Sequence, residues 1–205
     1  MPGGSKKLVP VRQDLVDAVY DIAREEGKAP YDLINDIFNQ TLRVHKMGKD
    51  LREIVDAYEL IETEKGSGSV IIGSDILYYM INKLYPTEMD KIGKMYFERG
   101  RWYGNYLFAK FFGSETSDDP LEPIVNMLRF SLWDVSTIDF KRKGDEITLS
   151  CIAPHLSEEG TEVLTQYLKG VFSALGYEAK AENINKGIIM ITFNSVGVQG
   201  ERKSP

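Results

Sequence analysis

Apolar and polar positions in the first 42 residues follow two different patterns. Residues 8–11 form a short, mainly apolar run of the kind that builds a strand. Beyond it, apolar residues recur at three- and four-residue steps over 15–23 and again over 33–42, as on the buried face of a helix. Gly27 stands where the first helix should end, and Pro30 suits the first turn of the second. The pattern therefore predicts a strand-helix-helix unit.

This N-terminal unit is too small to bury a core by itself. A lone strand also leaves its backbone N–H and C=O groups without hydrogen-bond partners. Antiparallel pairing with the same strand of a second chain would satisfy these groups and form a two-fold dimer. We therefore expect a homodimer that pairs through its N-terminal strand.

Helical periodicity returns over 49–64, where it predicts a connector helix. The four residues that follow, Gly66-Ser67-Gly68-Ser69, have the composition of a flexible linker. A short strand is predicted over 70–72. We therefore expect the N-terminal unit to cover 1–47, the connector helix and linker 48–69, and a second domain 70–196.

Two helices are predicted next, over 76–84 and 87–112, with Pro86 between them. The second is the longest in the chain. Gly93, Gly100 and Gly104 fall on roughly one of its faces. Because glycine carries no Cβ atom, this face permits the close approach of another backbone.

The rest of the chain predicts the order helix, hairpin, helix, hairpin. Asp119 and Pro120 begin a helix that runs to about residue 132, and Ser157 begins another that Gly176 stops. The strands are predicted over 135–141 and 146–152, joined at Lys143-Gly144-Asp145, and over 178–183 and 187–194, joined at Asn185-Lys186-Gly187. The second domain is thus predicted to be α+β with an antiparallel sheet, and the tail over 197–205 to be disordered.

Composition limits the functions that fit. The 205 residues are 42% hydrophobic and 27% charged, as in a globular protein with room for two domains. The formal net charge of -6 argues against indiscriminate nucleic-acid binding, so DNA contact would have to rest on a local basic patch. The single cysteine, Cys151, excludes an intrachain disulfide. Because neither a signal-peptide pattern nor an apolar run of membrane-spanning length is present, we expect a cytoplasmic protein.

The segment 6–42, "KKLVPVRQDLVDAVYDIAREEGKAPYDLINDIFNQTL", resembles the ribbon-helix-helix DNA-binding family in its spacing and its AREEG junction. The resemblance implies a dimer whose paired strands lie in the DNA major groove, with the start of each second helix at a phosphate. If Val9 and Val11 point into the core, the alternate residues face the bases; a slip of one residue would expose both valines. The DNA-contact residues implied are Lys6, Lys7, Leu8, Pro10, Arg12, Lys28 and Tyr31.

A second resemblance covers roughly 76–195. The segments "FERGRWYGNYLFAKFF", "DPLEPIVNMLRFSLWDVSTIDFKRKGDEITLSC" and "LTQYLKGVFSALGYEAKAENINKGIIMITF" resemble the 4-vinyl reductase-like domain family in order and spacing. That family implies a dimerising sensor module with an internal pocket for an aromatic or other small apolar ligand. Some members carry cysteines near the final hairpin that could bind metal, but no cysteine follows Cys151, so we predict no metal and no cofactor.

An aromatic cluster supplies the candidate ligand-binding residues. Aromatic side chains at helical spacing either line a pocket or fill the core, and both readings stay open. The candidates are Trp102, Tyr103, Tyr106, Phe108, Phe112 and Trp133. Cys151 shares a strand face with Ile147 and Leu149, which favours a buried structural thiol over a nucleophile.

Together the two resemblances imply a dimeric, ligand-responsive transcriptional regulator of the archaeal type. Its N-terminal unit would bind a double-stranded DNA operator. A small apolar ligand in the second domain would change the spacing of the two DNA-binding strands through the 49–64 helix. The alternative is a dimeric assembly or small-molecule-binding module that does not bind DNA. Since the sequence holds no phosphate-binding glycine loop, nucleophile elbow or paired-histidine zinc helix, we do not expect an enzyme.

Overall fold

The computed structural model of the chain describes residues 8–112 and 120–196. The chain forms two compact units, Met1–Glu59 and Leu60–Pro205. Their boundary falls inside a helix rather than in the glycine- and serine-rich stretch at 66–69. The first unit is helical and the second is α+β around an apolar core.

The junction between the first two helices lies where the sequence predicts, whereas the second helix extends beyond residue 42 and the third begins and ends two residues later than predicted. Gly27 adopts a φ of +64°, and the Lys28 N–H donates to the Ala23 carbonyl oxygen at 2.9 Å, which closes the first helix. Pro30 occupies the first turn of the second helix. The helices are α1 (Gln13–Glu25), α2 (Pro30–Lys46) and α3 (Leu51–Gly66), whose last residues belong to the second unit.

The predicted N-terminal strand is not formed in the structure. Residues 8–12 precede α1 without strand hydrogen bonds, and Val9 and Val11 are 63% and 52% exposed. A two-stranded ribbon takes one strand from each of two chains, so a single chain cannot supply its hydrogen bonds. The ribbon therefore stays a prediction.

Most apolar side chains of α1 and α2 are left uncovered in the single chain. Among the described residues of the first unit, only Ala23 and Leu33 are buried. Leu15, Phe38 and Leu42 are each more than half exposed. A helix pair with both apolar stripes in water has little hydrophobic stabilisation of its own.

A four-stranded antiparallel sheet forms the centre of the second unit, with the strand order β1-β2-β4-β3. Both hairpins turn where predicted, at Gly144 (φ +62°) and Gly187 (φ +71°). The strands are β1 (Thr137–Lys143), β2 (Glu146–Ile152), β3 (Tyr177–Asn185) and β4 (Ile188–Ser195). This arrangement confirms the predicted α+β class with an antiparallel sheet.

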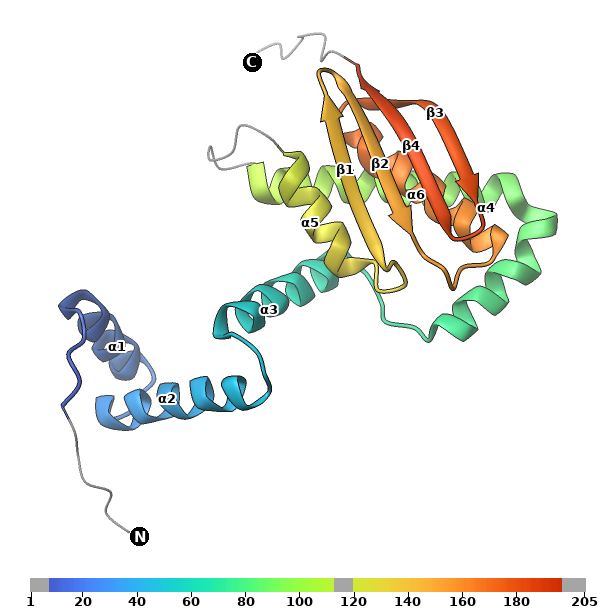
Figure 1. Cartoon of the computed structure of the whole chain (residues 1–205). Helices are drawn as coiled ribbons and strands as arrows, with labels where there is room; N and C mark the ends of the chain where they lie inside the picture. The colour runs from blue at the N-terminus through green and yellow to red at the C-terminus, as the bar shows by residue number, and fades with distance from the viewer. Residues whose placement is uncertain (1–7, 113–119, 197–205) are drawn as a thin grey trace, which may run out of the picture. The chain divides into compact units, whose positions relative to one another are not determined.

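Helices cover one face of this sheet (Figure 1). The helix α5 (Leu121–Ser131) packs beside β1, and α6 (Glu158–Ala174) packs against β3 and β4. The Ser157 hydroxyl accepts a hydrogen bond from the Gly160 N–H at 3.0 Å, which caps α6 as predicted. Pro120 rather than Asp119 precedes the first turn of α5; Asp119 itself lies outside the described residues, as does the predicted tail at 197–205.

The two predicted helices on either side of Pro86 form one kinked helix, α4 (Ser74–Phe112). The kink is at Glu88, whose φ of -126° and ψ of 22° are not helical. Pro86 lies two residues before it and weakens the same stretch of helix, because proline lacks an N–H and its ring crowds the carbonyl of the preceding turn. The predicted short strand at 70–72 is not present; these residues form an irregular segment before α4.

The predicted glycine face of α4 packs directly on the backbone of α6. A Cβ atom at Gly100 would lie 2.0 Å from the Tyr167 carbonyl oxygen, and one at Gly104 would lie 2.7 Å from that of Val171. On the facing helix, a Cβ at Gly170 would lie 2.0 Å from the Phe97 carbonyl oxygen. The close approach predicted from the glycine spacing is therefore confirmed.

Candidate functional site

A cavity of about 510 Å³ lies in the second unit. This volume is in the range of sites that bind small molecules. Its wall is assembled from the end of α3, the segment at 69–72, the first part of α4, the connection between α5 and β1, and α6. Apolar residues that line it include Leu60, Val70, Ile71, Leu77, Ile81 and Leu164.

Of the predicted ligand-binding aromatics whose side chains the structure describes, Trp133 lines this cavity and Trp102, Tyr103, Tyr106 and Phe108 do not. Tyr103 is buried in the core of the domain. Trp102 and Tyr106 stack on each other at 5.3 Å between ring centroids, and Phe108 is partly exposed. The side chain of Phe112 lies outside the described residues. The aromatic rings of the wall that the prediction missed are those of Tyr78, Tyr96 and Tyr167.

Two carboxylates are part of the cavity wall, and each accepts a hydrogen bond from a tyrosine. The Asp134 carboxylate accepts from the Tyr78 hydroxyl at 2.5 Å. The Glu64 carboxylate accepts from the Tyr103 hydroxyl and from the Ser69 hydroxyl, the latter at 2.7 Å. Burial, followed by these hydrogen bonds, raises the pKa of Tyr78 and Tyr103 well above the usual value. Both phenols therefore stay protonated at neutral pH.

The end of α3 is fixed to α4 by a set of side-chain hydrogen bonds. The Arg99 guanidinium donates to the Ser67 carbonyl oxygen at 2.9 Å and to the Ser69 hydroxyl at 3.2 Å. The Lys110 ammonium donates to the Thr63 hydroxyl at 2.5 Å. Ser67 is only 4% exposed. The stretch predicted as a flexible linker is thus part of the packed second unit.

The burial of Tyr103 and its hydrogen bond to Glu64 predict how the stability of the protein changes at high pH. Since the pKa of Tyr103 is raised above its ordinary value of 10.0, its contribution to stability is complete below pH 10 and is lost as pH rises above it. Each such tyrosine lowers the free energy of unfolding by about 1.4 kcal/mol per pH unit in that window. The free energy of unfolding, measured with urea between pH 9 and 11.5, should fall less steeply with pH in Tyr103→Phe than in the wild type. Equal slopes would contradict this.

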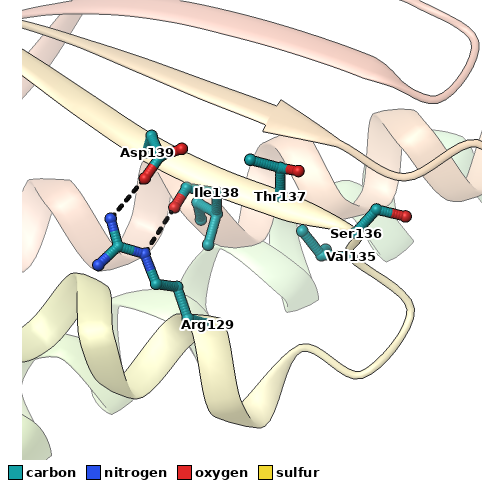
Figure 2. A pocket seen from close by; sticks show the side chains of 6 residues that line it. All are labelled: Arg129, Val135, Ser136, Thr137, Ile138 and Asp139. Atoms are coloured by element: carbon teal, nitrogen blue, oxygen red, sulfur yellow. Dashed lines mark hydrogen bonds and ion pairs between the residues drawn. The ribbon is translucent and has the colours of Figure 1, made fainter.

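A second, smaller depression of about 240 Å³ lies between α5 and β1 (Figure 2). Its one basic residue, Arg129, donates to the Ile138 carbonyl oxygen at 2.9 Å and to the Asp139 carboxylate at 2.5 Å. It also donates to the Asn126 side-chain oxygen at 2.6 Å. Because these bonds occupy its guanidinium, Arg129 joins α5 to β1 and is not available as an anion-binding group.

The single cysteine is not a reactive thiol, and the acidic and histidine side chains that the structure describes form no metal-binding cluster. Cys151 is 1% exposed, and burial raises the pKa of its thiol to about 12, so it is a protonated core residue as predicted. Among the residues that the structure describes, no cluster of His, Cys, Asp and Glu could hold a metal ion. In the same part of the chain, no helix combines the length and the apolar character needed to cross a membrane.

The predicted DNA-contact residues that the structure describes are at the surface. Leu8, Pro10 and Tyr31 are exposed. The Arg12 guanidinium donates to the Asp14 carboxylate at 3.0 Å, and the Lys28 ammonium lies 2.6 Å from that of Glu26. These carboxylates raise the pKa of both basic groups. Lys6 and Lys7 lie outside the described residues.

Comparison with known proteins yields only distant similarity. No protein-family model matches the chain, and no curated protein matches it. A solved structure from a study of heme distortion in the H-NOX family is 14% identical with a TM-score of 0.39, and the match covers 76% of this chain and 94% of that one. Another, from a study of H-NOX activation, is 12% identical with a TM-score of 0.37 and covers 70% and 88%. Values this low assign neither a fold nor a function.

Proposed function

We propose that this protein is a dimeric transcriptional regulator that binds DNA through its N-terminal unit and responds to a small apolar molecule in its second unit. The uncovered apolar stripes of α1 and α2 support the dimer, since a second copy would bury them. The cavity in the second unit supports the sensing role, because its volume and its largely apolar wall suit a small molecule.

The observation that carries the proposal is the course of α3. This helix runs without a break from Leu51 to Gly66, so it starts in the first unit and ends in the second. Leu60, Ile61 and Glu64 in its last turns line the cavity. A ligand that binds more tightly when these last turns are in one position than in another shifts the helix toward that position. Such a shift is the physical requirement for coupling the two units.

DNA contact in this proposal depends mainly on phosphates. Leu8 and Pro10 offer only apolar contact to base edges, whereas Lys6, Lys7, Arg12 and Lys28 can each approach a phosphate oxygen. The exposed ion pairs of Arg12 and Lys28 do not prevent this, because such pairs contribute little stability and exchange readily for a phosphate.

These ion pairs give a test of the proposed interface. Asp14→Asn and Glu26→Gln release Arg12 and Lys28 and remove a charge that repels phosphate, so each should raise the affinity for a DNA duplex about threefold or more at low salt. Asp21→Asn is the matched control, because it releases Arg24 from a similar exposed pair on α1 at a residue outside the predicted interface. Fluorescence anisotropy with a labelled duplex measures the affinities; an equal gain in all three variants would contradict the assignment.

The experiment that tests the proposal as a whole is sedimentation of the full chain with and without a labelled duplex at low salt. A regulator should sediment as a dimer and carry the duplex with it. A protein that stays monomeric, or a dimer that leaves the duplex behind, would overturn the proposal.

A dimeric module that does not bind DNA is the second candidate. The net charge of -6 and the apolar Leu8 and Pro10 favour it. It predicts the same dimer and the same ligand cavity, but no DNA binding at any salt concentration.

A further inference from the structure

The cavity carries an excess of negative charge. Among the residues that the structure describes, two carboxylates, from Glu64 and Asp134, line it, against one basic residue, Lys65. The Lys65 side chain is 77% exposed, and its ammonium lies 3.7 Å from the Glu62 carboxylate, which is not part of the cavity wall. Among the described residues, the Lys65 ammonium thus pairs with Glu62 and with neither cavity carboxylate.

Asp134 is the less compensated of the two. Its carboxylate accepts one hydrogen bond, from the Tyr78 hydroxyl, and it forms no ion pair among the residues that the structure describes. Glu64 accepts two hydrogen bonds, and one of its partners, Ser69, also accepts from the Arg99 guanidinium. Asp134 is an exposed residue, and a carboxylate has about four acceptor positions, so it keeps several that a ligand could fill in place of water.

The surrounding rings add to the attraction for a cation. Tyr78, Tyr96, Trp133 and Tyr167 line the cavity, and the faces of aromatic rings attract a positive charge. An anionic head group would instead meet two carboxylates of like charge.

From these contacts we infer that the cavity takes an apolar primary amine, protonated at neutral pH, whose aryl or alkyl body packs on the apolar wall and whose ammonium pairs with Asp134. The inference rests on the proposed function in one respect, that the cavity holds a ligand. It adds the chemical class: a cation rather than a neutral alcohol, a phenol or a carboxylic acid. The ion pair supplies orientation, and the apolar wall supplies most of the binding energy.

Three probes of nearly the same size separate these classes: 2-phenylethylamine, 2-phenylethanol and phenylacetate. Binding to the full-length protein at pH 7 is measured by calorimetry and by tryptophan fluorescence in a Trp102→Phe background, in which the signal comes from Trp133 of the cavity wall. We expect the amine to bind at least tenfold more tightly than the alcohol, and the carboxylate to bind most weakly. Asp134→Asn keeps an acceptor for Tyr78 and should remove the preference for the amine, whereas Glu62→Gln, which removes a charge from the same region outside the cavity, should keep it.

The possible results separate a failure of the amine inference from a failure of the proposed ligand-sensing role. If the alcohol or the carboxylate binds as tightly as the amine, the amine class is wrong while the cavity remains a ligand site. If Asp134→Asn retains the full preference for the amine, the assignment of the ion pair to Asp134 is wrong. If none of the three probes binds, both the inference and the sensing role of the cavity fail.

Discussion

Replacing Gly170 with alanine is expected to destabilise the second unit by about 3 kcal/mol or more. The added Cβ would lie 2.0 Å from the Phe97 carbonyl oxygen and 2.8 Å from the Arg101 backbone nitrogen. Neither atom is the end of a flexible side chain, so α4 and α6 would have to separate along their whole contact. Urea unfolding followed by far-ultraviolet circular dichroism measures the change.

Gly93 provides the matched control on the same crossing. Its added Cβ would meet only the Gln166 side chain, at 3.6 Å, which is ordinary van der Waals contact. Gly93→Ala should therefore be neutral, or stabilising by up to about 1 kcal/mol through the better helix propensity of alanine. If Gly170→Ala unfolds at the same urea concentration as Gly93→Ala, the close packing of α4 on α6 is wrong.

Removing both N-terminal lysines is expected to have the largest effect on DNA binding. The variant Lys6→Ala with Lys7→Ala removes four positive charges from a dimer, so the slope of log affinity against log salt should become shallower by about 3 to 4. At low salt the affinity should fall by about 100-fold or more, because each lost phosphate contact also loses the release of its counterion. The variant should remain dimeric, since neither lysine belongs to the predicted apolar face.

A control with the same change in charge tests whether position matters. Lys141→Ala with Lys143→Ala removes two exposed lysines from β1 in the second unit. This variant should keep nearly all of the DNA affinity. An equal loss in both double variants would show that net charge, rather than the N-terminal unit, determines the binding.

Much of the fold could be predicted because local signals decide it. Gly144 and Gly187 mark the turns of both hairpins, since each takes a positive φ that other residues rarely adopt. Ser157 predicts the start of α6 because its hydroxyl can accept from a first-turn N–H. The glycine face of α4 could also be recognised, although the sequence did not identify α6 as the helix that packs on it.

The cavity could not be predicted in the same way. Its wall joins an irregular segment, Val70 to Ile72, with the connection around Trp133 and Asp134, and these segments have no common periodicity in sequence. The aromatic run of α4 gave a stronger sequence signal, but the helical turn directs Tyr103 into the core and leaves Trp102 at the surface. Which aromatic residues meet a cavity depends on tertiary packing.

The predicted N-terminal strand is not formed in a single chain, and the reason is a different one. Its hydrogen bonds would come from a second copy, so neither the local pattern nor the fold of one chain can form it. The exposure of Val9 and Val11 is the expected state of such a strand before pairing.

Titration of a DNA duplex with the full-length protein across a range of salt concentrations tests the central claim most directly. Each chain offers four candidate phosphate contacts, Lys6, Lys7, Arg12 and Lys28, so a dimer offers eight. Full use of these contacts gives a slope of about -7 for log affinity against log salt concentration. We predict binding at low salt with a steep negative slope that approaches this limit. No binding at low salt, or an affinity that does not change with salt, would contradict the account.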